Sequence, residues 1–281
     1  MRLKIIFFAV FSTLMCFSNI CAQGYVDFLP DNVKNPFIER RDLITKELEK
    51  PIKNEWVGVY SRYVGETWSE WLALAPQNGF AAFRDTCSYG PRAWVNYGSV
   101  DFRDGLLTIN SDRGESADFV LDLPGKAFMP IKWGEQHWPI PTDKLDLFAY
   151  AINSRAAEEY EAFYIKGEDI QKPQKGQPDL PPQYKRLLGM APIRAKVIKI
   201  GVGPEKWYPE MTLDVGRREG VIVGMSFWLS GMKGITVKTR ATEVEARTST
   251  VEVIEVGFEP GADQNIEPKP GWRFTSRYNG R

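Results

Sequence analysis

Two tight-turn dipeptides, Asn78-Gly79 and Asp104-Gly105, constrain the fold of this chain more than any other feature of its sequence. Each dipeptide stands between two runs of apolar and β-branched residues, and the second pair of runs follows directly on the first. Asn-Gly and Asp-Gly suit the positive-φ positions of type I′ turns, which join neighbouring antiparallel strands. The sequence therefore predicts two consecutive hairpins and an antiparallel β-meander.

Beyond the hairpins, the apolar pattern changes from strand to helix. Leu145, Phe148, Ala149 and Ile152 recur at i, i+3, i+4 and i+7, which predicts an amphipathic helix over about 142–153 with Thr142 as its N-cap. We expect this helix to close the sheet of a β-rich first domain, residues 53–166. The segment EYEAFYIKG, residues 159–167, is expected to add a last strand.

The last third of the chain, residues 183–281, has the pattern of strands and turns throughout. Its segments alternate β-branched residues, and adjacent apolar residues such as Val253-Ile254 predict β-bulges. Gly216, Gly220 and Gly224 recur at four-residue spacing, but the Gly-Lys-Ser/Thr end and the following helix of a phosphate-binding loop are missing. We expect a small C-terminal β-barrel or sandwich, and a mainly β fold with minor helix.

Two further segments frame these domains. Residues 167–182 are rich in Pro, Gly, Gln and charge, which predicts an exposed linker. Residues 23–52 form an N-terminal arm, in which Phe37, Ile44 and Leu48 lie on one face of a short charged helix that Pro51 ends. We expect this helix to lie across the first domain as a lid, with docking to a partner as the alternative.

Residues 1–22 predict a secretory signal peptide. Arg2 and Lys4 precede an apolar run from Ile5 to Phe17, and small and polar residues follow it up to Ala22. The run is shorter than the ~20 residues that a membrane span needs. We therefore expect cleavage after Ala22, export to the periplasm or beyond the cell, and no membrane span in the mature chain. A retained N-terminal anchor is the alternative.

Cleavage would leave a single cysteine in the mature chain. Cys16 and Cys21 are removed with the signal, so that only Cys87 remains and an internal disulfide is excluded. Cys87 could be a nucleophile or could join two copies of the chain. A small buried side chain is the commoner role of a free cysteine, and we favour that interpretation.

Composition and charge restrict the partners. The chain has 43% apolar, 26% charged and 13% aromatic residues, as a globular protein does. Residues 24–179 carry 18 Lys and Arg against 25 Asp and Glu, a balance of −7, whereas residues 180–281 carry 16 against 11, a balance of +5. The halves could dock on each other, or the second could lean on an anionic envelope surface. Nucleic acid is not expected as a partner, because it requires a denser basic stripe.

The one histidine of the chain, His137, stands in the segment KWGEQHWPIP between Trp133 and Trp138. Pro139 and Pro141 remove two backbone donors, which predicts an edge strand or a loop. Aromatic faces beside polar tips are typical of a sugar or small-ligand platform. The alternative is that both tryptophans pack in the core, as we expect of the other strand aromatics, while His137 completes their hydrogen bonding. The candidate ligand-binding residues are Trp133, Glu135, His137 and Trp138.

Few residues could support catalysis or bind a metal. A Ser-His-Asp or Cys-His arrangement would have to use His137, yet a Gly-x-Ser-x-Gly motif is missing and Cys87 lies in a different predicted element. One histidine and one cysteine cannot supply the usual ligands of zinc, so no cofactor is expected. A hydrolase based on two carboxylates needs only a pair of acids, and Glu135 is the best-placed candidate.

Two short stretches resemble parts of known β-barrels. Residues 56–60, Trp-Val-Gly-Val-Tyr, are similar to the first strand of lipocalin-like small-ligand barrels, and this resemblance favours ligand binding. Residues 215–227, VGRREGVIVGMSF, resemble the strand-turn-strand of small barrels in bacterial envelope and flagellar-accessory proteins. No site residue is carried over from either resemblance.

Two classes of function follow from these observations. The first is a non-enzymatic exported module that binds or scaffolds a protein partner or an envelope component, for which we expect an exposed apolar surface or strand edge. The second is a small-ligand or glycan binder, or a carboxylate-dependent hydrolase, with a cleft near His137 in which polar groups converge. We favour the first class.

Overall fold

The computed structural model describes residues 26–27, 29–51, 53–63, 68–86, 92–112, 121–123, 125–155, 163–201, 209–262 and 267–278. The predicted fold class, mainly β with few helices, is confirmed. The chain divides into two compact units, which are unit 1 (Met1–Lys144 with Glu161–Asp179) and unit 2 (Leu145–Tyr160 with Leu180–Arg281). The predicted signal peptide and Cys87 lie outside the described residues.

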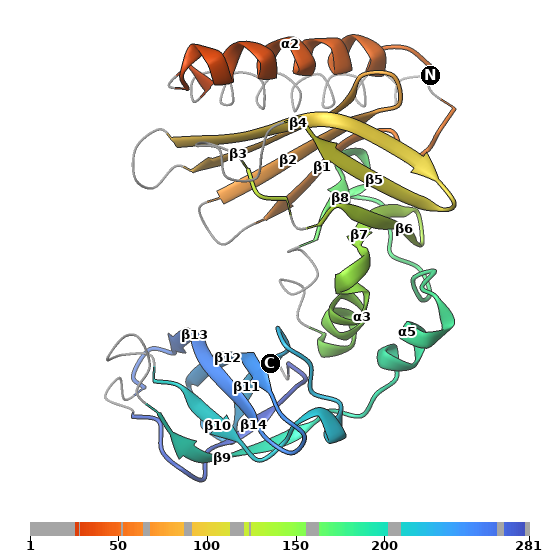
Figure 1. The fold of residues 1–281 in the computed structure, drawn as a ribbon. Helices are drawn as coiled ribbons and strands as arrows, with labels where there is room; N and C mark the ends of the chain where they lie inside the picture. The colour runs from red at the N-terminus through yellow and green to blue at the C-terminus, as the bar shows by residue number, and fades with distance from the viewer. Residues whose placement is uncertain are drawn as a thin grey trace. The chain divides into compact units, whose positions relative to one another are not determined.

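Unit 1 contains an eight-stranded antiparallel sheet with the order β7-β6-β5-β4-β3-β2-β1-β8 (Figure 1). Seven strands follow one another as the predicted meander, and β8 pairs with β1, so that the sheet nearly closes on itself. The short helix η1 (Thr142–Lys144) follows β7, and η2 (Gly167–Asp169) follows β8. The strands are β1 (Gly58–Tyr63), β2 (Trp68–Ala75), β3 (Gly79–Thr86), β4 (Arg92–Arg103), β5 (Leu106–Ser111), β6 (Ala127–Trp133), β7 (Gln136–Pro141) and β8 (Ile165–Lys166).

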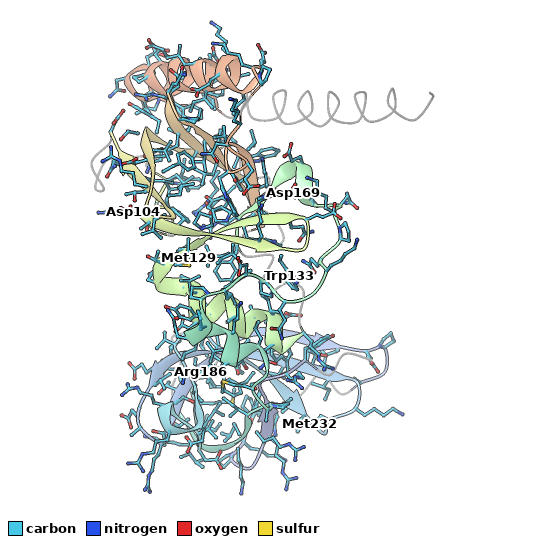
Figure 2. The ribbon with its side chains drawn as sticks, turned by 90° about the vertical axis from the view of Figure 1, so that its right-hand side faces the viewer. Asp104, Met129, Trp133, Asp169, Arg186 and Met232 are labelled. Carbon is cyan, nitrogen blue, oxygen red and sulfur yellow. The ribbon has the colours of Figure 1, made fainter. Side chains whose placement is uncertain are left out.

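Both predicted hairpins form, but only one has the predicted turn. Asp104 and Gly105 both adopt positive φ, 53° and 73°, as a type I′ turn requires. Asp104 is labelled in Figure 2. At the other hairpin only Gly79 has positive φ, 77°, and Pro76–Asn78 form a three-residue loop. The type I′ prediction is wrong there, and the observed three-residue loop is tied to a helix. Asn78 donates from its backbone N and its Nδ2 to the Glu47 carboxylate, at 3.0 and 2.8 Å.

That helix is α2 (Asp31–Leu48), which runs over strands β2 to β4 in Figure 1. Phe37 and Ile44, on the predicted apolar face, are buried against Phe83 and Val95 on one face of the sheet. The other face carries a second apolar cluster. Both faces of the sheet are therefore covered, as expected for strands with near-continuous apolar runs. The second cluster contains Tyr60, Leu72, Leu74, Phe80, Ala82, Leu107, Ile109, Leu121, Phe128 and Tyr164.

The predicted helix after the hairpins forms as α3 (Leu145–Ser154), but it groups with unit 2. Tyr150 lies in the core of unit 2 and donates from its hydroxyl to the backbone oxygen of Ser276 at 2.7 Å. In unit 1 the short strand β8 (Ile165–Lys166) takes the place at the edge of the sheet that was predicted for the helix. Residues 163, 164 and 167 of the predicted last strand do not form strand, and residues 159–162 lie outside the described residues.

Unit 2 is a closed barrel with the order β10-β13-β12-β11-β14-β9. The predicted bulge at Val253-Ile254 is present, since Lys238 pairs with Glu255 and Thr239 pairs with Val253. In the described part of the chain, no helix has the length and apolarity of a membrane span. The strands are β9 (Arg194–Ile200), β10 (Met211–Leu213), β11 (Ser226–Ser230), β12 (Ile235–Val244), β13 (Ser249–Phe258) and β14 (Arg273–Thr275), and the helices are α5 (Pro182–Leu188) and η3 (Arg217–Glu219).

Candidate functional site

The candidate site lies in unit 1 where the edge strand β7 meets the residues that follow β8. Pro139 and Pro141 have no backbone N–H and cannot donate to a neighbouring strand. Residues 167–179, most of which are exposed, lie along this edge. Asp179 N donates to the Lys132 oxygen at 2.8 Å, and Trp133 Nε1 donates to the Gly176 oxygen at 3.1 Å. Side chains and irregular backbone thus replace a β-ladder.

Gly134, at the turn between β6 and β7, makes this close approach possible. Its φ is +61°, which favours glycine. A Cβ atom at this position would lie 2.5 Å from Lys175 N and 2.6 Å from Pro173 O. The β6–β7 turn and residues 173–175 therefore pack backbone to backbone, and Gly134 is the residue type that permits it.

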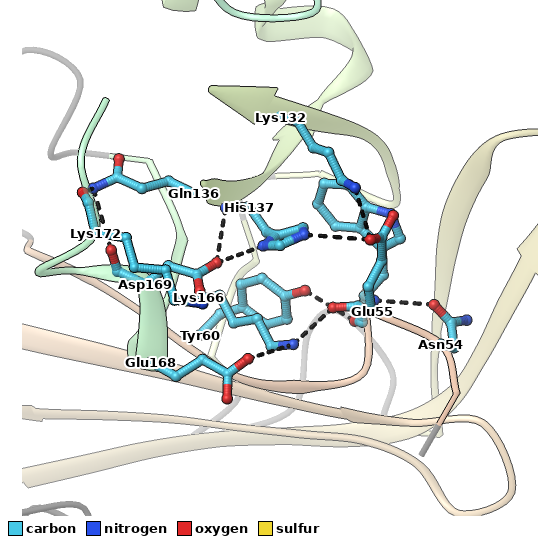
Figure 3. Close-up of polar contacts among 11 residues, drawn as sticks. Asn54, Glu55, Tyr60, Lys132, Gln136, His137, Lys166, Glu168, Asp169 and Lys172 are labelled. Carbon is cyan, nitrogen blue, oxygen red and sulfur yellow. Dashed lines mark hydrogen bonds and ion pairs between the residues drawn. The ribbon is translucent and has the colours of Figure 1, made fainter. Parts of the chain in front are cut away.

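His137 and Asp169 form the centre of the site (Figure 3). Asp169 Oδ2 accepts a hydrogen bond from His137 N at 2.9 Å and lies 2.6 Å from the ring nitrogen Nδ1. Its other oxygen accepts a hydrogen bond from Lys172 Nζ, and this contact raises the pKa of Lys172. The Asp169 side chain is fully buried. One buried carboxylate therefore fixes both the backbone and the ring of His137.

The second ring nitrogen of His137 faces another carboxylate. Nε2 lies 3.7 Å from Glu55 Oε2, which is within ion-pair range but beyond hydrogen-bond range, and Nε2 is buried without a hydrogen-bond partner. Lys132 Nζ contacts the same Glu55 oxygen at 2.7 Å, and this hydrogen bond lowers the pKa of Glu55. The Trp56 ring and the imidazole form a T-shaped pair with a centroid separation of 4.9 Å. The ring is thus enclosed on both sides.

Further contacts from Tyr60 on β1 and Lys166 on β8 join these strands to the same cluster (Figure 3). The nearly buried Lys166 Nζ donates to the Glu55 backbone oxygen at 2.7 Å and pairs with Glu168 Oε1 at 3.0 Å. Tyr60 donates from its hydroxyl to the Trp56 oxygen at 2.9 Å, and burial raises the pKa of Tyr60. We call the following residues the seam cluster: Glu55, Lys132, His137, Lys166, Glu168, Asp169 and Lys172.

The charges of the seam cluster are matched within it. Each of its three lysines pairs with one of its three carboxylates. The Gln136 amide donates two further hydrogen bonds from Nε2, to the backbone oxygen of Asp169 at 3.2 Å and to the backbone oxygen of Lys172 at 2.8 Å. The cluster therefore joins three separate stretches of chain by internal contacts.

The four predicted ligand-binding residues are not brought together on one surface. Trp138 and Trp133 are 2% and 9% exposed, with ring centroids 6.4 Å apart, and the β7 pleat places His137 on the opposite face from Trp138. Glu135 is exposed in the turn and pairs with Lys175 at 3.7 Å. The interpretation that His137 completes the hydrogen bonding of the tryptophans is wrong, because its polar partner is Asp169.

A second buried polar group lies elsewhere in the same sheet. Glu70 is fully buried and accepts hydrogen bonds from Arg62 at 2.6 Å, from Arg84 at 3.0 Å and from the Tyr164 hydroxyl at 2.9 Å. Burial raises the pKa of Tyr164. The cross-strand pairs Arg62–Glu70 and Glu70–Arg84 bring these charges together, so this group also joins neighbouring strands.

The chemistry open to the seam cluster is limited by access to the imidazole. A histidine base must reach the proton that it removes, directly or through one water, and Nε2 is buried against Glu55. Within the described ranges, no group of three His, Cys, Asp or Glu side chains could hold a metal ion. Comparison with protein-family models, curated proteins and solved structures finds no match. The geometry itself is therefore the guide to function.

Proposed function

We propose that this chain is an exported, non-enzymatic binding or scaffolding protein that acts on a protein partner or an envelope component. The observation that carries the proposal is that the His137 ring lies between two carboxylates, with Nδ1 against Asp169 and the buried Nε2 against Glu55. Any nucleophilic mechanism of the Ser-His or Cys-His type would have to use this imidazole, because the chain has no other. A ring held in this way acts as a connection between segments.

The distribution of ionic contacts in unit 1 supports the same proposal. The seam cluster and the Glu70 group each use a fully buried carboxylate to join separate strands or segments. Buried ion pairs fix the relative positions of the strands and segments that they join. Unit 1 is thus suited to hold a fixed surface towards a partner.

Export rests on the signal-like sequence of residues 1–22. Expression of the full chain in a bacterium with an inner and an outer membrane, followed by fractionation and N-terminal sequencing, tests it. We expect a mature chain that begins at Gln23 in the periplasm or the medium. A chain that stays in the cytoplasm with its first residues intact would contradict export.

The non-enzymatic part of the proposal is tested with the mature chain and His137→Gln. Both proteins are incubated with ester, amide and glycoside substrates, and separately cross-linked to an envelope fraction. We expect the same cross-linked species from both proteins and no turnover by either. Turnover by the wild-type chain that His137→Gln abolishes, while the variant remains folded, would show that the imidazole is catalytic.

A further inference from the structure

A hollow on the outside of the unit 2 barrel gathers basic side chains away from the seam cluster. Its volume is about 660 Å³, which is within the size range of small-molecule sites. Asp214 is the one carboxylate of its lining. Ser230 and Thr275 add hydroxyl groups. The basic residues of the lining are Arg155, Arg194, Lys196, Arg273 and Arg277.

The register of strands β9 and β14 brings these cations together. Along β9, Arg194 and Lys196 are exposed and alternate with buried apolar residues. Lys196 pairs directly with Arg273 on β14, and Arg194 pairs with Thr275. Like charges directly opposite each other on antiparallel strands are destabilising. The barrel therefore carries an unfavourable pair of cations in the lining of the hollow.

The basic side chains of the hollow are not neutralised by the protein. Among the residues that the structure describes, none of the five forms an ion pair with a carboxylate. Asp214 lies in the lining, but its Oδ1 accepts a hydrogen bond from the backbone N of Lys196 at 2.7 Å. The hollow therefore holds a local excess of positive charge, which attracts an anion.

Arg277 is fixed in place by hydrogen bonds, and Arg155 stands at the end of a helix. Arg277 Nη2 donates to Asn153 Oδ1 at 2.8 Å and to the Met190 oxygen at 3.1 Å, which orients its guanidinium group. Arg155 directly follows α3 with φ of 64°, a left-handed conformation that an arginine adopts at a cost. A glycine would be the usual residue at such a helix end, and the arginine adds a cation to the hollow in its place.

We infer that this hollow binds a ligand through a phosphate group. Guanidinium groups match the oxygens of a phosphate with two parallel hydrogen bonds, and the lysine and the hydroxyl groups add single donors. The volume accommodates a phosphorylated molecule larger than a lone ion. This inference goes beyond the proposed function, because it assigns a site and a ligand chemistry that can be tested without the partner.

The test uses the mature full chain, pyrophosphate as a soluble probe, and vesicles of phosphatidylcholine with or without phosphatidylglycerol as lipid probes. The variant Arg273→Glu reverses a charge inside the hollow. Lys199→Glu reverses an exposed charge on the same strand β9 but outside the lining, and serves as the matched control. Calorimetry measures pyrophosphate binding, and co-sedimentation measures binding to vesicles.

We expect the wild-type chain to bind pyrophosphate, Arg273→Glu to weaken binding by about tenfold or more, and Lys199→Glu to change it by less than about twofold. Binding to phosphatidylglycerol vesicles that pyrophosphate competes away would identify a lipid headgroup as the source of the phosphate. Binding of pyrophosphate without vesicle binding would identify a soluble ligand. No binding of either probe, or equal losses in Arg273→Glu and Lys199→Glu, would overturn the inference.

Discussion

Replacement of Asp169 by alanine is the most demanding test of the seam cluster. The carboxylate is fully buried and contacts His137 N, His137 Nδ1 and Lys172 Nζ. Removing one partner of a buried ion pair costs about 3–5 kcal/mol, because the other group stays buried without compensation. His137 remains mostly buried, whereas the Lys172 side chain is 39% exposed and can be hydrated, so its share is small. We therefore expect a loss of about 3 kcal/mol in the free energy of unfolding of unit 1.

Urea unfolding followed through the backbone amide NMR signals of β6 and β7 measures this loss in unit 1 alone. Glu135→Ala is the matched control. It removes a carboxylate that lies three residues before Trp138 in the chain, and the ion pair of this carboxylate with Lys175 is exposed. The control is expected to stay within about 0.5 kcal/mol of the wild-type chain. An Asp169→Ala protein as stable as Glu135→Ala would refute the conclusion that the seam cluster holds the sheet edge.

Three further predictions address other parts of the chain. Gly134→Ala should destabilise unit 1 by about 2 kcal/mol or more in the same urea assay, because a Cβ would meet backbone atoms at 2.5 and 2.6 Å at positive φ; a change below the error of the assay would contradict the close packing. Burial raises the pKa of Tyr60 and Tyr164 in the folded chain, so the unfolded chain loses these phenol protons at a lower pH than the folded chain does. The free energy of unfolding is therefore unaffected by these groups below pH ~10, and above that pH it falls by up to ~1.4 kcal/mol per pH unit for each group. Phenolate absorbance should then show two of the 11 tyrosines ionising only as the chain unfolds, and full ionisation before unfolding would count against this. In the absence of ligand, Arg273→Glu should raise the stability of unit 2 by about 0.2–1 kcal/mol, because it turns the like-charged pair with Lys196 into an opposite-charged one, and a loss of stability would contradict that account.

Much of the fold follows from local sequence patterns. The positive-φ dipeptide Asp104-Gly105 and the alternation around it were enough to predict a hairpin with its turn, and the interrupted alternation at Val253-Ile254 predicted a bulge. At Asn78-Gly79 the dipeptide predicts the hairpin correctly but the turn type incorrectly, because the loop has three residues. The observed loop also contacts Glu47, 31 residues earlier in the chain, and no local pattern records this contact.

The composition of residues 167–179 indicated a linker because it contains few apolar side chains to bury. Composition does not show that backbone groups and one aspartate can hold such a segment against a sheet edge. His137 was identified from sequence because it is unique, but Asp169 lies 32 residues away in that same segment. A buried Asp-His contact depends on the tertiary fold, and so does the burial of Trp133 on β6 and of Trp138 on β7.

The most direct test of the account is an NMR measurement of the His137 ring signals in the mature chain, before and after an envelope fraction is added. The chain has one histidine, so the assignment is unambiguous. If the imidazole is a structural connection to Asp169, its signals shift in Asp169→Asn but stay unchanged when the envelope fraction is present and other signals of the chain respond. Ring signals that shift with the envelope fraction would place His137 in a binding or reacting site and contradict the proposed function.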